Sequence, residues 1–128
     1  MSLRTPLGRV LGLGAAKEGP GHWWWQRLTS VALIPLSLWF FFSLVGLGSL
    51  DYPAVREWLA DPMHALLVLL LVATLFYHSR LGVQVVVEDY VHHQGLKLLA
   101  LILVDFAHVL AAVIGLFAIL KVTVGEAG

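Results

Sequence analysis

The sequence from Pro62 to Val87 reads PMHALLVLLLVATLFYHSRLGVQVVV, and this stretch decides the fold. A helix that crosses the hydrocarbon core of a bilayer needs about 20 apolar residues, each rising 1.5 Å. The run is long enough, yet it keeps His78 and Arg80 close to its end. Ionisable side chains cost several kcal/mol inside a membrane unless they are partnered. The run therefore predicts a transmembrane helix whose His and Arg have a function or a partner.

Two further apolar runs flank this one. We expect transmembrane helices at about 28–50, 62–87 and 98–122, in a single membrane domain over residues 1–128 whose residues 1–27 form a cytoplasmic amino-terminal segment. The composition agrees, because 59% of the residues are hydrophobic, 12% are charged and the mean hydropathy is +0.87. That leaves too little polar surface for a soluble domain of this size, so we expect an all-α integral membrane protein.

The absence of Cys and the charge balance limit the cofactors and partners that the chain can bind. A chain with no Cys can neither ligate an iron–sulfur cluster nor form a disulfide, so any metal or haem must be held by His. The formal net charge of +0 argues against nucleic acid as a partner.

Lys and Arg in the short flanks predict the orientation in the membrane. One side carries most of them, Arg4, Arg9, Lys17, Arg27 and Lys97, and the other carries Arg56 and Lys121. We therefore expect the amino terminus in the cytoplasm and the carboxyl terminus in the periplasm. No cleavable signal is evident in the first residues, which favours a bacterial inner (cytoplasmic) membrane protein.

His78 is the strongest candidate for a cofactor-binding residue. If the span ends near Glu88, His78 lies about 15 Å from that surface, around mid-membrane. A neutral imidazole at that depth is a good axial ligand for haem. It is equally able to hydrogen-bond a neighbouring helix, so the residues alone leave both roles open.

Arg80 and Asp105 have opposite charges and, on antiparallel spans, are both about 12 Å deep. We expect them to pair. By the same count, His108 lies within one helical turn of the depth of His78. It is a rival haem ligand, a residue that supports the haem site without ligating the iron, or only a contact of Asp105 at i,i+3, and we favour the last two roles.

A motif then appears along the second span. His78 is followed by Gly82 four residues later and by Asp89-Tyr90 at eleven and twelve, and residues 22–29 read HWWWQRLT with Arg27-x-Thr29 at the start of the first span. On these residues and the three-span layout, about residues 20–122, the chain resembles the bacterial D-type hydrophobic membrane anchor of succinate dehydrogenase (respiratory complex II).

The resemblance implies partners and a function. Such an anchor is three helices that form half of a two-subunit bundle, with a C-type cytochrome b subunit as the other half. It holds an iron–sulfur subunit and a flavoprotein subunit on the cytoplasmic face, where electrons from succinate, a tricarboxylic acid cycle intermediate, pass to ubiquinone in electron transport. The chain alone then has no complete active site.

The resemblance also assigns residues. His78 would be an axial ligand of the iron of haem b, with a His of the C-type subunit opposite it. Arg27 would pair with a haem propionate in addition to anchoring the first span at the interface. Tyr90 would contact ubiquinone directly and Asp89 would support that site or its proton supply.

An alternative of a different class is a purely structural transmembrane subunit of another respiratory or transport complex, without a cofactor. His78 and the Arg80–Asp105 pair would then only join helices, and Tyr90 would be an interfacial aromatic. The D-type pattern does not require Asp105 or His108, so their roles stay open.

Overall fold

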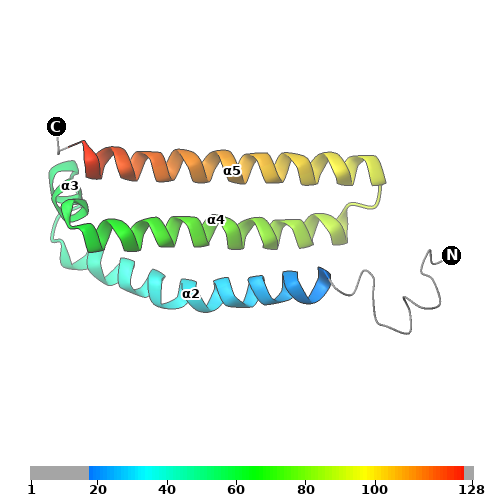
Figure 1. Ribbon diagram of the computed structural model, residues 1–128, viewed down its shortest axis with the longest axis horizontal. Helices are drawn as coiled ribbons and strands as arrows, with labels where there is room; N and C mark the ends of the chain where they lie inside the picture. Colours follow the sequence, from blue (N-terminus) through cyan, green and yellow to red (C-terminus); the bar gives the residue numbers. More distant parts are fainter. Residues whose placement is uncertain (1–17, 126–128) are drawn as a thin grey trace.

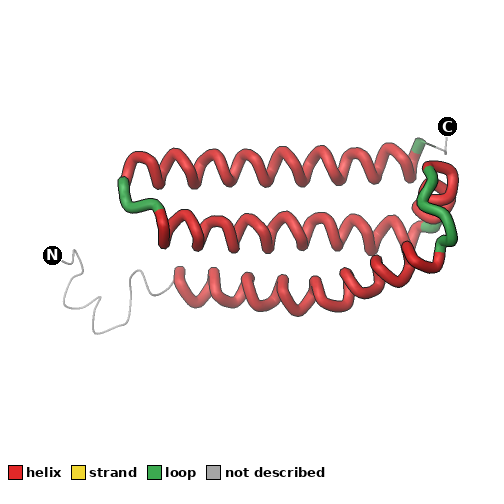
Figure 2. Tube along the Cα trace, turned by 180° about the vertical axis from the view of Figure 1, so that it is seen from behind, coloured by secondary structure: helices red, strands yellow, loops and turns green. Residues whose placement is uncertain are grey.

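The computed structural model describes residues 18–125, which form four helices and the connections between them. Three long helices, α2 (Glu18–Gly46), α4 (Pro62–Tyr90) and α5 (Gln94–Val124), lie side by side with α4 in the middle (Figure 1). The short α3 (Tyr52–Ala60) covers one end of this layer, as the view from behind also shows (Figure 2). All three long helices are apolar and long enough to cross a membrane, so the predicted all-α fold with three spans is confirmed.

Side chains at the N-cap positions of α4 and α5 accept hydrogen bonds from backbone N–H groups in the first turn of each helix. Asp61 accepts a hydrogen bond from the backbone N–H of Met63 at 2.8 Å ahead of α4, and Pro62 occupies the first turn, where its missing N–H costs nothing. His93 caps α5 in the same way, because its Nδ1 accepts from the N–H of Leu96 at 3.2 Å.

The helices extend beyond the expected spans. α2 begins ten residues before position 28 and ends at Gly46, four residues before position 50, while α4 and α5 reach Tyr90 and Val124. Hydropathy marks only the apolar part of a helix, whereas helical hydrogen bonding continues into the polar interface. After α2 the chain reverses at Gly48, whose φ of 74° lies in the region that favours glycine.

The connection between the first two spans is more ordered than the sequence predicts. The polar connection with Pro at both ends predicts one interfacial helical turn, whereas the structure has the nine-residue α3, which Asp51 caps by accepting from Ala54 N–H at 3.0 Å. Trp58 of α3 stacks on Trp39 of α2 at 5.6 Å and on His64 of α4 at 4.8 Å between ring centroids. Aromatic stacking thus fixes α3 against the ends of two spans.

Few side chains are buried within this layer. The buried apolar residues among those described are Leu59, Ala65, Val68, Leu71 and Leu81, while large apolar side chains cover the outside. Where α4 meets α5, a methyl group at Gly115 would lie 3.4 Å from Cγ1 of Val72, so the missing side chain lets these helices approach closely. The exposed apolar surface suits lipid and a partner chain rather than water.

Candidate functional site

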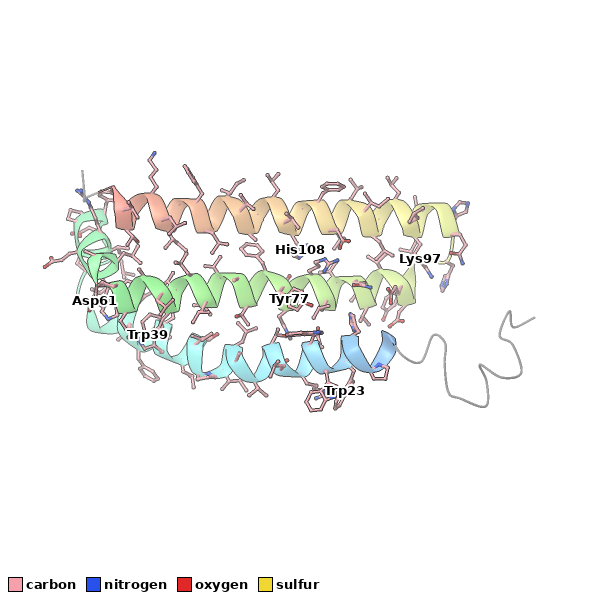
Figure 3. All side chains as sticks on the ribbon, in the orientation of Figure 1. Trp23, Trp39, Asp61, Tyr77, Lys97 and His108 are labelled. Atoms are coloured by element: carbon pink, nitrogen blue, oxygen red, sulfur yellow. The ribbon has the colours of Figure 1, made fainter. Side chains whose placement is uncertain are left out.

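Three consecutive residues of α4 connect it to both neighbouring helices. The Nδ1 of His78 lies 2.9 Å from Oγ1 of Thr29 in α2. On the other side, Ser79 Oγ lies 3.1 Å from His108 Nε2, and Arg80 Nε donates to Asp105 Oδ1 at 2.7 Å. Figure 3 shows the neighbouring Tyr77 and His108 near the middle of the long helices. The polar contacts therefore lie at the depth where a membrane protein can least leave them unpaired.

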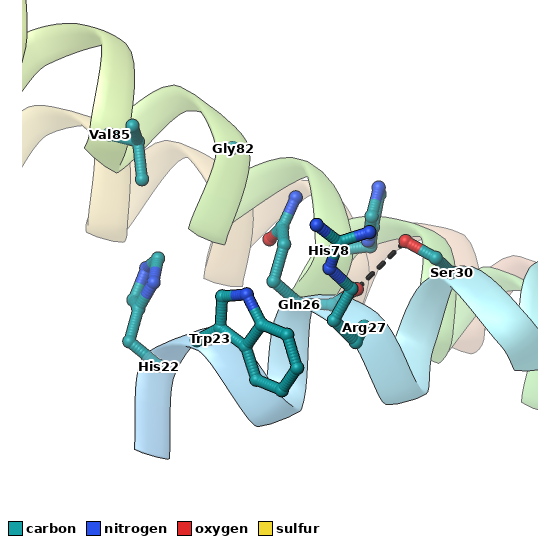
Figure 4. Close-up of a pocket in the computed structure, with 8 residues that line it drawn as sticks. All are labelled: His22, Trp23, Gln26, Arg27, Ser30, His78, Gly82 and Val85. Atoms are coloured by element: carbon teal, nitrogen blue, oxygen red, sulfur yellow. Dashed lines mark hydrogen bonds between the residues drawn. The ribbon is translucent and has the colours of Figure 1, made fainter. Parts of the chain in front are cut away.

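His78 lines an open cavity of about 540 Å³ between α2 and α4 (Figure 4). The remaining lining residues come from both helices: His22, Trp23, Gln26, Arg27, Ser30, Gly82 and Val85. Gly82 follows His78 by one helical turn, and a methyl group there would touch only Gln26 Nε2, at 3.8 Å. Since Gly82 has no side chain, the space beside the imidazole stays open.

The imidazole of His78 is half-buried and uses one of its two nitrogens. Its Nε2 makes no hydrogen bond to any of the described residues, 18–125. The ring is therefore oriented by Thr29 and retains one nitrogen for another partner.

Two more polar atoms in the cavity wall have no partner. His22 Nε2 and Gln26 Oε1 are buried and form no hydrogen bond within the described part of the chain. Buried polar atoms are nearly always hydrogen-bonded, so unsatisfied ones that share a cavity indicate a polar group supplied from outside the described residues.

Arg27 lines the same cavity as His78. Its guanidinium carbon is 5.4 Å from the centroid of the Trp23 ring, a cation–π contact that holds the side chain at the interface. The structure therefore brings two of the four predicted site residues, His78 and Arg27, to one cavity.

Asp89 and Tyr90 lie elsewhere, at the end of α4. They are exposed, with Tyr90 at 78%, and neither lines the cavity of His78. Along the helix they are about 17 Å from His78. A ligand at Tyr90 would therefore be covered by another chain or by lipid.

The predicted pair of Arg80 and Asp105 is confirmed by the 2.7 Å contact. His108 lines one cavity with Asp105 and Arg80, while both of its ring nitrogens lie within hydrogen-bond distance of other residues. Nδ1 lies 2.8 Å from the carbonyl oxygen of Val104, which can only accept, so Nδ1 carries the proton and Nε2 accepts from Ser79. This occupies the lone pair that a rival iron ligand would need.

Several residues of the site cannot be recognised from sequence patterns. Gln26 and Ser30 line the cavity, and Thr29 contacts His78, because of how α2 is rotated against α4, which hydropathy does not report. The only available signal is their spacing near Arg27, which puts them on successive turns of one helix. The described residues contain no cluster of three or more metal-ligating side chains.

Comparison with known proteins places the chain in a family. Residues 1–115 match the family described as the succinate dehydrogenase/fumarate reductase transmembrane subunit. The succinate dehydrogenase hydrophobic membrane anchor subunit of Rickettsia bellii is 32% identical over 110 residues, which is 86% of this chain and 88% of that protein. The protein of the same name from Rickettsia conorii is 32% identical over 89% of this chain and 94% of its own length.

A third relative comes from outside that genus. The succinate dehydrogenase membrane anchor subunit of Reclinomonas americana is 29% identical over 75% of this chain and 82% of its own length. No solved structure matches the chain significantly. Three membrane-length helices and the family match over most of the sequence agree, and the chain belongs to the family of succinate dehydrogenase and fumarate reductase transmembrane subunits.

Proposed function

We propose that this chain is the D-type membrane anchor of a succinate:quinone oxidoreductase, that it co-ligates haem b, and that it forms part of the ubiquinone reduction site. The family membership and the names of the relatives support the anchoring role. The haem and the quinone are supported by the residues themselves.

The observation that carries the haem proposal is the cavity between α2 and α4. It combines an oriented imidazole with a free Nε2, an Arg from the interface, a Gly that leaves space, and two polar atoms without partners. This donor set fits a haem: a neutral imidazole for the iron, apolar walls for the porphyrin, and a cation for a propionate.

The roles of individual residues follow from this fit. His78 would supply one axial nitrogen, and a His of the C-type subunit would supply the other. Arg27 would neutralise a propionate, and Gln26 or His22 would complete the hydrogen bonds at that edge. When bound, a bis-histidine haem b accepts and releases single electrons near the quinone.

The quinone site would lie at the end of α4. Tyr90 would donate a hydrogen bond from its phenolic hydroxyl to a ubiquinone carbonyl, and Asp89 would maintain the proton supply. The exposure of Tyr90 fits a site that the iron–sulfur and C-type subunits complete.

The start of α2 and the α4–α5 connection share one end of the layer, which carries Arg27 and Lys97 (Figure 1). We place the flavoprotein and iron–sulfur subunits there, at the cytoplasmic face, with the carboxyl terminus in the periplasm. The membrane would be a bacterial inner membrane.

One observation favours a second candidate. The Thr29–His78 bond joins α2 to α4, as expected for a purely structural subunit in which His78 only connects helices. A reduced-minus-oxidised optical spectrum of the purified complex separates the two, because only the proposed function yields the absorption band of a b-type haem. A complex that contains this chain and has no such band would contradict the haem proposal.

A further inference from the structure

We infer that Thr29 is a positioning residue for His78: it holds the imidazole in the tautomer with the proton on Nδ1, so that the lone pair of Nε2 points into the cavity. The inference rests on the proposed haem ligation and adds to it a residue whose hydroxyl never touches the haem.

Two carbonyl oxygens and one ring nitrogen surround the hydroxyl of Thr29. Oγ1 of Thr29 lies 2.7 Å from the carbonyl oxygen of Trp25, 3.1 Å from that of Gln26 and 2.9 Å from Nδ1 of His78. A hydroxyl has one proton to donate and two lone pairs with which to accept. Both carbonyl oxygens can only accept, so the single Thr29 proton is directed to the backbone of α2.

The contact with His78 must therefore run the other way. If Nδ1 lacked a proton, the hydroxyl would have to donate to it, and an oxygen lone pair would face the Trp25 carbonyl oxygen at 2.7 Å without a proton between them. With the proton on Nδ1, the ring donates to Oγ1 and the hydroxyl proton fills the 2.7 Å contact with the Trp25 carbonyl. The Gln26 carbonyl, at the longer distance of 3.1 Å, also accepts from the Ser30 hydroxyl at 2.8 Å. This second arrangement satisfies all the groups.

The surroundings make the arrangement stable. Thr29 is 7% exposed and is the buried polar side chain found among the described residues. Water that could reverse the hydrogen bonds is largely excluded, and an unpaired group at this depth is costly. The backbone of α2 thus selects the tautomer of a histidine in α4.

The tautomer has two consequences for a ligated iron. Nε2 presents its lone pair without a rearrangement of protons, and a hydrogen bond from Nδ1 makes the imidazole a stronger electron donor. A stronger donor stabilises ferric iron more than ferrous iron. The Thr29 hydroxyl should therefore strengthen haem retention and lower the midpoint potential.

The test compares variants in the complete membrane complex. Thr29→Val keeps the shape of the side chain and removes the hydroxyl, and Thr29→Ser keeps the hydroxyl. Thr123→Val is the matched control, because the Thr123 hydroxyl also donates to a carbonyl one helical turn earlier, that of Ile119 at 2.8 Å, but lies in α5 outside the cavity of His78. Haem content after dilution in detergent and redox titration of the haem absorbance are the measurements.

We expect Thr29→Val to weaken haem retention by about 10- to 100-fold and to raise the midpoint potential, with Thr29→Ser and Thr123→Val close to wild type. If Thr29→Val impairs assembly, Thr29→Ala is measured in its place. Unchanged retention and potential without the hydroxyl, in a complex that loses its haem on His78→Leu, would overturn the role of Thr29 and leave the proposed function standing. A wild-type complex without a b-type haem would overturn both.

Discussion

Arg80 and Asp105 join two neighbouring transmembrane helices through an ion pair, with Nε of the guanidinium 2.7 Å from Oδ1 of the carboxylate. Their side chains are 33% and 47% exposed, so the chain itself does not fully cover them. Each charge compensates the other where neither can be solvated by water. The pair therefore both connects α4 to α5 and allows an Arg to remain deep in the second span.

Replacing Asp105 tests this pairing. Asp105→Asn removes the compensating charge, and an unpartnered Arg near the middle of a span costs about 3 kcal/mol. We expect less assembled complex on native gels and a lower melting temperature, and the double variant Arg80→Gln/Asp105→Asn should recover most of the loss. Normal assembly of Asp105→Asn alone would show that another group compensates Arg80.

Gly82 tests whether the space beside His78 is used. Gly82→Ala should be tolerated, because a methyl group there meets only the end of the Gln26 side chain at 3.8 Å. Gly82→Leu extends further into the cavity and should lower the haem content of the assembled complex without removing the catalytic subunits. Haem per flavin, measured in the purified complex, distinguishes the two. Full haem occupancy with Leu at this position would mean that the haem lies elsewhere.

Part of this site follows from the sequence because depth along a helix can be counted. Equal depth and opposite charge predict the pairing of Arg80 with Asp105, and the structure has that pair. The family resemblance, rather than depth, names His78 and Arg27 as residues of one site, and both line one cavity. For the ion pair, residue number sets the distance from the membrane surface, and that distance is sufficient for the prediction.

The contacts that the sequence does not predict depend on how each helix is rotated about its own axis. The Thr29–His78 contact and the Ser79–His108 contact require the facing sides of the helices to be known. Apolar residues surround all three spans, so no polar face marks the orientation of each helix, and the bonds of His108 to Ser79 and Val104 are not predicted for that reason. Apolar side chains can face either lipid or a neighbouring helix, so the apolar stripe that marks the buried face of a helix in a soluble protein is missing.

His108 provides a control for the identity of the iron ligand. Both of its ring nitrogens are used, by Val104 and by Ser79, so we expect His108→Leu to retain the b-type spectrum. The lost interhelical bond should lower stability by about 0.6 kcal/mol, the average for such bonds in a membrane protein. Optical spectroscopy and thermal denaturation of the assembled complex measure the two effects. Disappearance of the haem spectrum would make His108 the ligand.

Tyr90 tests the quinone site. Tyr90→Phe keeps the ring at the interface and removes the hydroxyl, so succinate-dependent quinone reduction should fall by about 1–3 kcal/mol of transition-state stabilisation, the cost of an unmade buried hydrogen bond. Reduction of an artificial soluble acceptor by the catalytic subunits should be unchanged. Tyr52→Phe, another exposed tyrosine at the opposite end of the layer, is the matched control. Equal quinone reductase rates in wild type and Tyr90→Phe would leave Tyr90 as an interfacial aromatic.

The central claim is that His78 ligates a haem b shared with a second membrane subunit, and the spectrum of the His78→Leu complex tests it most directly. His92→Leu, in the exposed connection between α4 and α5, controls for the loss of a histidine from the same region. Assembly is checked by succinate-dependent reduction of a soluble acceptor in membranes. The account predicts an assembled complex in which the low-spin b-type signal is lost or strongly shifted by His78→Leu and unchanged by His92→Leu. An unaltered haem spectrum in an assembled His78→Leu complex would contradict it.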